Sequence, residues 1–160
     1  MASRFFPRSR LLVRLFVVFL LTLAWAGGFP SAIHADSVSL SIKTDSALHT
    51  FTVEVMQNPA DRAQGLMHRK HLDADRGMLF DFGEPITAMM WMKNTYIPLD
   101  MLFIRSDGKI ANIARDTVPL STEILGSKGL VRYVLEINAG LSMKLGISPG
   151  DQVVLPGAAH

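Results

Sequence analysis

Polar side chains lie between two strongly apolar segments in the stretch Met90-Trp91-Met92-Lys93-Asn94-Thr95-Tyr96-Ile97-Pro98-Leu99-Asp100-Met101. Pro98 lacks a backbone N–H group and biases Ile97 toward an extended conformation, so we predict that one strand ends and the next begins here. Buried polar atoms must find partners or they cost free energy. The polar cluster Lys93-Asn94-Thr95, together with Asp100, is therefore a candidate binding site. The alternative is a purely structural turn.

Strand patterns flank this stretch on both sides. Before it, the segment from Ile86 to Met92 carries large apolar side chains on both faces, which is typical of a strand covered on both sides. After it, Asp107-Gly108 suits the two-residue turn of a β-hairpin, which would oppose Ile104 to Ala111. We expect Ile104 and Ala111 to share the core face of this hairpin and Ile110 to point away from it.

The remaining strands are predicted from the alternation of apolar and polar residues, and the helices from residues that favour helix ends. Asn58 and Pro59 favour the start of a short helix that Gly65 ends, and Asn138 is expected to cap a second helix that ends at Gly146. Further strands are predicted at residues 37–44, 49–56, 78–82, 133–137 and 152–155. The predicted fold is an α+β domain, mainly antiparallel β, with a barrel-like sheet and two short helices.

The first 35 residues have the features of a signal peptide, which leaves residues 36–160 as a single compact β-rich domain. Four arginines between Arg4 and Arg14 precede an apolar run from Leu15 to Ala26, and we expect cleavage after Ala35. The apolar run is shorter than the roughly 20 residues that a membrane span needs. We therefore expect a periplasmic or secreted protein without membrane contact after cleavage. An N-terminally membrane-anchored protein is the alternative.

The charge of the domain differs from that of the whole chain. The chain has 16 basic and 14 acidic residues, but residues 1–35 hold four of the basic ones and none of the acidic ones. The domain is thus slightly acidic, whereas nucleic-acid binding normally requires a basic surface, so we expect no nucleic-acid partner. The chain has no cysteine, which excludes a disulfide, a thiol nucleophile and a thiolate metal site. We expect a monomer.

Three further motifs carry a resemblance to a known family. They are Arg62-Ala63-Gln64-Gly65-Leu66-Met67, Arg76-Gly77-Met78-Leu79-Phe80 and Gly146-Ile147-Ser148-Pro149-Gly150-Asp151. With the stretch from Met90 to Met101, they resemble the prokaryotic domain-of-unknown-function family 192 over roughly residues 50 to 156. The resemblance implies a compact β-rich domain with short helices that is often exported. It implies no reaction, because the family has no established one.

The first functional hypothesis is a binding site for a small polar or anionic ligand. Lys93 would supply charge, and Asp100 or Glu136 would hold its ammonium group in place. Glu136 stands out because an acid in the middle of an apolar strand must face solvent or find a partner. An ion pair that only orients the strands is the structural alternative. The ligand-binding residues expected from the sequence are Lys93, Asn94, Thr95, Asp100, Glu136, Arg62, Arg69 and Trp91.

Copper handling is a second hypothesis. The domain holds eight methionines, and Met89, Met90 and Met92 are close in sequence. Thioether sulfur is a soft ligand suited to Cu(I), and the imidazole of His68 or His71 would complete the site. Only Met90 and Met92 would share a strand face, however, and methionine is a common core filler. Core packing therefore explains these residues better, and we predict no metal site and no cofactor.

A hydrolase-like enzyme is the third hypothesis. Lys93 with Asp100, or Asp100 with Glu136, would form an acid–base pair if burial separated their pKa values. The sequence has no Gly-x-Ser-x-Gly elbow, no His-Glu-x-x-His helix and no Gly-rich phosphate loop. We therefore assign no catalytic residue and expect a periplasmic binding or accessory domain rather than an enzyme.

Overall fold

Most of the alternating segments of the sequence join one large β-sheet. The computed structural model describes residues 37–155, so the predicted signal peptide lies outside the described residues. In chain order the elements are β1 (Ser37–Lys43), β2 (Leu48–Met56), α1 (Pro59–Gln64), β3 (Arg76–Ile86), β4 (Met89–Met90), β5 (Leu99–Ile104), β6 (Ile110–Ala114), β7 (Leu125–Gly126), β8 (Val131–Asn138), α2 (Leu141–Lys144) and β9 (Gln152–Val154).

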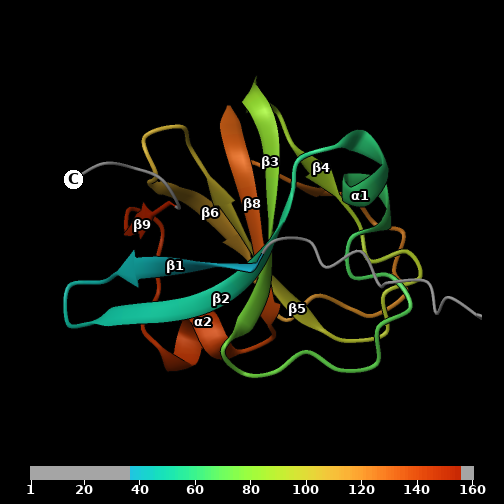
Figure 1. The fold of residues 1–160 in the computed structure, drawn as a ribbon, viewed down its shortest axis with the longest axis horizontal. Helices are drawn as coiled ribbons and strands as arrows, with labels where there is room; N and C mark the ends of the chain where they lie inside the picture. Colours follow the sequence, from blue (N-terminus) through green and yellow to red (C-terminus); the bar gives the residue numbers. More distant parts are fainter. Residues whose placement is uncertain (1–36, 156–160) are drawn as a thin grey trace, which may run out of the picture. The chain divides into compact units, whose positions relative to one another are not determined.

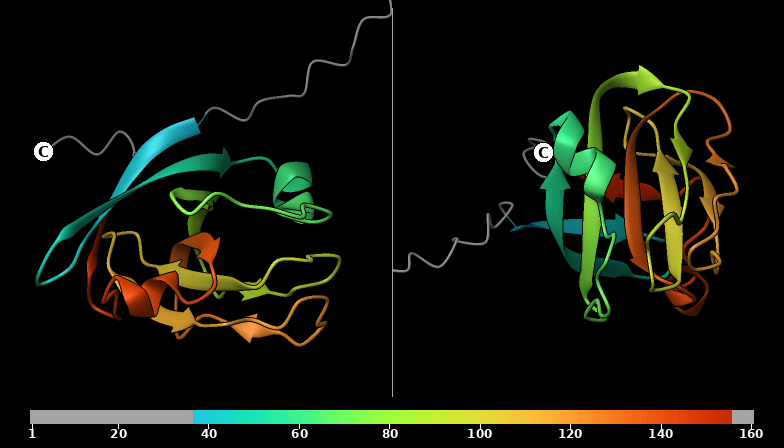
Figure 2. Two further views of the ribbon diagram at one scale, coloured as in Figure 1. Left: turned by 90° about the horizontal axis from the view of Figure 1, so that it is seen from below. Right: turned by 90° about the vertical axis from the view of Figure 1, so that its right-hand side faces the viewer.

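The large sheet has seven strands in the order β6-β5-β8-β3-β2-β1-β9, and β4 pairs with β7 in a separate two-stranded sheet. Within the large sheet β2 and β3 are parallel, and the other neighbouring strands are antiparallel. In Figure 1, β1 and β2 run across the view while β8 runs upright, and Figure 2 shows the same strong curl from two other directions.

The two edges of this curled sheet meet at one end. Lys109, just before β6, bridges to Gln152 in β9, and the Val153 N–H donates to the Gly108 carbonyl at 2.8 Å. An added Cβ on Gly108 would lie 2.6 Å from the carbonyl oxygen of Val153, so only glycine fits this approach. The result is a half-barrel, mainly antiparallel, with two short helices, which confirms the fold class predicted from the sequence.

Apolar side chains cover both faces of the sheet. The inner core lies on the concave face and draws on all seven strands; its buried residues are Leu40, Ile42, Phe51, Val53, Leu79, Leu102, Ile104, Ile110, Leu135, Ile137, Ile147 and Val153. The outer core lies on the other face, mainly over β3, β5 and β8; its buried residues are Met56, Leu66, Leu72, Met78, Phe80, Ala88, Met92, Leu99, Met101, Phe103, Val131 and Val134. Because side chains alternate along a strand, β3, β5 and β8 serve both cores.

The hairpin of β5 and β6 differs from its prediction by one residue. A bulge after Phe103 pairs Ile104 with Ile110 instead of Ala111. An extra residue in one strand moves the following side chains to the opposite face. Ile110 therefore packs in the inner core and Ala111 against the outer core, which reverses the predicted assignment.

The predicted strand from Ile86 to Met92 is also wrong. β3 continues through the bulge at Asp81 and Ile86, and only Met89 and Met90 form a strand after it. Ala88 and Met92 are buried in the outer core, but Met89 is 72% exposed. The segment therefore lies at the surface, with one apolar side open to solvent.

The predicted caps of the first helix are confirmed, whereas the predicted N-terminal cap of the second helix is wrong. The Asn58 side chain accepts from the Asp61 N–H at 2.8 Å, Pro59 opens α1, and Gly65 closes it with φ of +49°. Gly140, not Asn138, precedes α2, and the Asn138 amide instead donates to the Leu72 and Asp73 carbonyls. Neither described helix has the length or apolar character to span a bilayer.

Candidate functional site

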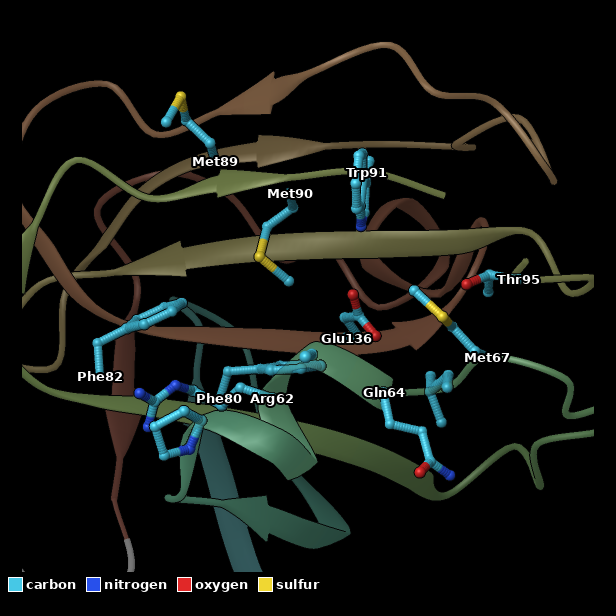
Figure 3. Close-up of a pocket in the computed structure, with 14 residues that line it drawn as sticks. Arg62, Gln64, Met67, Phe80, Phe82, Met89, Met90, Trp91, Thr95 and Glu136 are labelled. Carbon is cyan, nitrogen blue, oxygen red and sulfur yellow. The ribbon is translucent and has the colours of Figure 1, made fainter. Parts of the chain in front are cut away.

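A cavity of about 380 Å³ opens beside the outer core, among α1, β3, β8 and the segment 89–95 (Figure 3). Most of its wall is apolar, as is usual for pockets that bind small molecules. Its lining residues are Pro59, Arg62, Ala63, Gln64, Gly65, Leu66, Met67, Phe80, Phe82, Met89, Met90, Trp91, Thr95 and Glu136.

One wall is built by the turn that ends α1. Gly65 has a positive φ, and an added Cβ would lie 3.1 Å from Cζ of Phe80, so glycine lets this turn pack closely on β3. The turn buries Leu66 and places Met67 at the cavity. Local capping signals therefore position one side of the site.

The opposite wall depends on backbone contacts between distant loops. Met89 and Met90 pair with β7, and the Met92 N–H donates to the Ser121 carbonyl at 3.0 Å. Asn94 has φ of +56°, and its carbonyl accepts from the His68 N–H at 2.9 Å. These contacts hold the ring of Trp91, which is 44% exposed, at the rim of the cavity.

The Glu136 carboxyl lies at the inner end of the cavity. On β8, Glu136 lies between Met78 of β3 and Met101 of β5, and it is only 4% exposed. Figure 3 shows the carboxyl pointing into the cavity, between Phe80 and the ring of Trp91. Within residues 37–155 its oxygens have no hydrogen-bond or ion-pair partner.

Burial without a partner changes the acidity of this group. Desolvation penalises the charged form, and it raises the pKa of Glu136 to about 8. Perturbed acids of this kind gather at functional sites because structural carboxyls are normally paired. Glu136 is thus the strongest chemical feature of the cavity.

Arg62 lines the cavity, but its guanidinium is engaged elsewhere. Its Nη1 donates to the carbonyls of Gln57 and Asp81, the latter at 3.1 Å, and its Cζ lies 5.5 Å from the centre of the Phe82 ring. Figure 3 shows the guanidinium directed away from Glu136. The arginine therefore borders the site without pairing with the buried acid.

The structure brings together four of the eight ligand-binding residues expected from the sequence. Arg62, Trp91, Thr95 and Glu136 line the cavity, whereas Lys93, Asn94, Asp100 and Arg69 do not. Thr95 is buried, and its hydroxyl donates to the Lys93 carbonyl at 3.3 Å. The exposed Lys93 places its ammonium 5.1 Å from the centre of the Trp91 ring.

Asp100 is fully buried, and its carboxylate accepts hydrogen bonds from the backbone. One oxygen accepts from the Asp116 N–H and the other from the Ser142 N–H in α2, both at 2.9 Å. Asp100 thus caps α2 from a neighbouring strand, and its two oxygens accept from backbone N–H groups and form no ion pair with Lys93. Since Met101 lies opposite Glu136 in the ladder, Asp100 and Glu136 point to opposite faces of the sheet, which separates the proposed acid–base pair.

Arg69 and Asn94 also have structural contacts. Arg69 forms a two-pronged ion pair with Glu54, at 2.5 and 2.6 Å. Asn94 is exposed, and its amide lies 3.9 Å from the Met67 sulfur. These contacts fit the structural alternative for both residues.

The residues proposed for copper have different surroundings, although Met89 and Met90 both line the cavity. Met89 is exposed, while Met92 is buried and its sulfur accepts from the Thr117 hydroxyl at 3.2 Å. His71 pairs with Asp73, and the His68 ring lies against Tyr96. Nor do three His, Asp or Glu side chains of the described part of the chain gather around a common point where a metal ion could bind.

Several cavity residues were not expected from the sequence. Met67, Phe80, Phe82, Met90 and Gln64 line the site, but their pattern is that of ordinary core and helix residues. Phe80 shares a face with Glu136 because Met78 pairs with Glu136, and that register is set by long-range pairing. The only available signal was the motif 62–67, which supplies six consecutive lining residues.

Comparison with known proteins links the chain to a family but to no activity. The sequence model of the DUF192 family, described as "Uncharacterized ACR", matches residues 40–155. No curated protein sequence matches the chain.

Two solved structures share both the fold and much of the sequence. One is a proposed transcription regulator from Sinorhizobium meliloti 1021, at 50% identity and a TM-score of 0.75, covering 76% of this chain and 95% of that one. The other is a protein of unknown function from Novosphingobium aromaticivorans DSM 12444, at 40% identity and a TM-score of 0.73, covering 74% of this chain and 85% of that one.

Proposed function

This chain belongs to the DUF192 family, and from that premise we propose that it is an exported binding module for a small ligand that enters the Glu136 cavity. One observation carries the proposal: a carboxyl that is 4% exposed lies in a largely apolar cavity without a partner in residues 37–155. A hydrogen bond to a charged group contributes about 1.5–3 kcal/mol. A ligand that supplied the missing contacts would recover that free energy.

The wall of the cavity indicates the shape of the ligand. Aromatic and methionine side chains surround the carboxyl, so the ligand should have an apolar body and one polar end. Methionine side chains are flexible and polarisable, which lets such a wall adapt to more than one molecule. The proposal therefore concerns a class of amphiphilic ligands and assigns no reaction.

Export is part of the proposal and is supported by the sequence. A basic and then apolar segment precedes the domain, and removing it leaves 12 basic and 14 acidic residues. The name of the Sinorhizobium protein raises nucleic-acid binding as another function class. The slight acidity of the domain disfavours that class, and Arg69 and Arg132 are already paired with carboxylates.

Trp91 provides a direct test of binding. The chain has two tryptophans, so Trp25→Phe in the full chain leaves Trp91 as the sole tryptophan, at the cavity rim. Titration of this protein with 1-octanol below its solubility limit should give a saturable change in Trp91 fluorescence. The physical reason is that the alkyl chain replaces water beside the indole ring.

Two variants of α1 locate the bound probe. Ala63→Phe adds a ring to a residue that lines the cavity, whereas Ala60→Phe adds the same ring to an exposed residue that does not. We expect Ala63→Phe to weaken octanol binding at least tenfold and Ala60→Phe to leave it unchanged. An absent response to 1-octanol, octylamine and octanoate alike would overturn the proposed function, and so would equal binding by the two variants.

A further inference from the structure

The charged groups around the cavity are unequal in their freedom to bind a ligand. Glu136 is the acid in the lining and has no partner among the residues described, while Arg62 is the base in the lining and is engaged. The remaining polar lining side chains, Gln64 of α1 and Thr95, are neutral. The free contact in the cavity is therefore a carboxyl group, which can donate one hydrogen bond when protonated and can bind a cation when ionised.

Charged side chains on the neighbouring elements do not pair with Glu136. Asp81 of β3 is paired with Arg132 of β8 at 3.0 Å, beside a different hollow. Lys93 lies outside the lining, with its ammonium near the Trp91 ring. No cation from α1, β3, β8 or the segment 89–95 therefore neutralises Glu136.

The aromatic side chains favour the same sign of ligand charge. Phe80, Phe82 and Trp91 line the cavity, and the faces of aromatic rings attract cations. Two rings at this site already have cations beside them: Arg62 lies near Phe82 and Lys93 near Trp91. A ligand cation would find the same attraction on the cavity side.

We infer that the cavity binds an apolar molecule that ends in a protonated primary amine, whose ammonium group forms an ion pair with the Glu136 carboxylate. This inference rests on the proposed function and narrows its ligand. An ammonium group carries three donors and a positive charge, so it satisfies the buried acid better than an alcohol, which offers one donor. A carboxylate ligand could accept one hydrogen bond from the protonated acid, but it would find no cation in the cavity unless Arg62 left the Gln57 and Asp81 carbonyls.

Binding should release a proton. At neutral pH the buried acid of the free protein is mainly protonated, because its pKa is raised to about 8. The ammonium ion and the neutral carboxyl then form the ammonium–carboxylate pair and one free proton. Affinity for the amine should therefore increase by about tenfold per pH unit from pH 6 toward pH 8 and then level off.

Three probes with the same alkyl chain test the inference: octylamine, 1-octanol and octanoate, each below its aggregation limit. With the full Trp25→Phe chain at pH 7.5, we expect octylamine to bind at least tenfold more tightly than 1-octanol, and octanoate to bind most weakly. In Glu136→Gln the preference for amine over alcohol should fall to near one. The matched surface variant Glu84→Gln should keep the preference, because Glu84 is exposed and lies outside the lining.

The outcomes separate the inference from the function it rests on. Equal binding of octylamine and 1-octanol, or a preference for octanoate, would overturn the inference and leave the binding function standing. An amine preference that persists in Glu136→Gln, or an affinity that does not change between pH 6 and pH 8, would also overturn it. A response to none of the three probes would remove the proposed function itself.

Discussion

Two buried carboxyls on neighbouring strands of the same sheet have opposite environments. Asp100 on β5 and Glu136 on β8 are one position apart in the ladder, and both are almost wholly inaccessible. Asp100 faces α2 and accepts two backbone N–H groups. Glu136 faces the cavity and has no protein partner in the described chain. The comparison shows that two equally buried acids can differ in their partners, and that only Glu136 leaves its carboxyl open to a cavity.

The contributions of the two carboxyls to the free energy of unfolding should differ in sign. A carboxylate that accepts two backbone donors stabilises the fold, because those donors have no other acceptor. A buried acid without a partner destabilises the fold whenever pH favours its charged form. Substitutions at the two positions therefore test the comparison directly.

The largest effect is expected at Asp100. Asp100→Ala removes the acceptor for the Asp116 and Ser142 N–H groups and detaches the start of α2. We expect the free energy of unfolding to fall by about 4 kcal/mol, measured by urea denaturation at pH 7. The exposed Asp75→Ala serves as a control and should change it by less than about 0.5 kcal/mol. A loss below about 1 kcal/mol in Asp100→Ala would contradict the stabilising role assigned to the two hydrogen bonds of Asp100.

Glu136→Gln should stabilise the protein, and only above acidic pH. The pKa of Glu136 rises from 4.5 in the unfolded chain to about 8 in the folded protein, so the folded state binds more protons between these values. Stability contributed by this group is thus complete below pH 4.5, declines as pH rises, and is lost above pH 8. Relative to the natural chain, Glu136→Gln should gain on the order of 3 kcal/mol at pH 8.5 and little at pH 4.5.

Urea denaturation of both proteins at several pH values measures this difference. Glu84→Gln is the control, because Glu84 is exposed and lies outside the cavity lining. If Glu136→Gln is less stable than the natural chain at pH 8.5, the acid has a partner in solution and the contrast with Asp100 is lost.

The smallest effect on stability is expected at Arg69, a charged residue that does not line the Glu136 cavity and is not fully buried. Arg69→Met breaks the ion pair with Glu54, in which both side chains remain partly exposed. Pairs of this kind contribute about 1 kcal/mol or less, so a small loss of stability should appear in thermal melts. The response of Trp91 to octylamine should not change. A weaker response would show that Glu136 is not the only charged contact on its side of the sheet.

Local patterns were sufficient for much of the fold. Alternation predicted β1, β2 and β8, and the Asn58-Pro59 pair with Gly65 predicted both ends of α1. These signals involve residues that are neighbours in sequence, so a single chain contains all the information they need. The resemblance to DUF192, now supported over residues 40–155, added the expectation of a compact β-rich domain with short helices.

Predictions failed where a distant contact outweighed the local signal. The bulge after Phe103 exchanged the faces of Ile110 and Ala111, and no residue type in the hairpin predicts this bulge. Asn138 looked like a helix cap, but the Leu72 and Asp73 carbonyls bind its amide instead. Half of the expected site residues likewise do not line the cavity. Two of them, Asp100 and Arg69, instead bind partners elsewhere in the chain, Ser142 and Glu54.

The sequence by itself determined a curled, mainly antiparallel domain and singled out Glu136 as an acid in an apolar strand. Only the tertiary structure decided which face each acid occupies, because side chains alternate along a strand and one step of register moves a group to the other side. Strand pairing placed Asp100 against α2 and left Glu136 facing the cavity. The chemistry proposed for this protein depends on that difference.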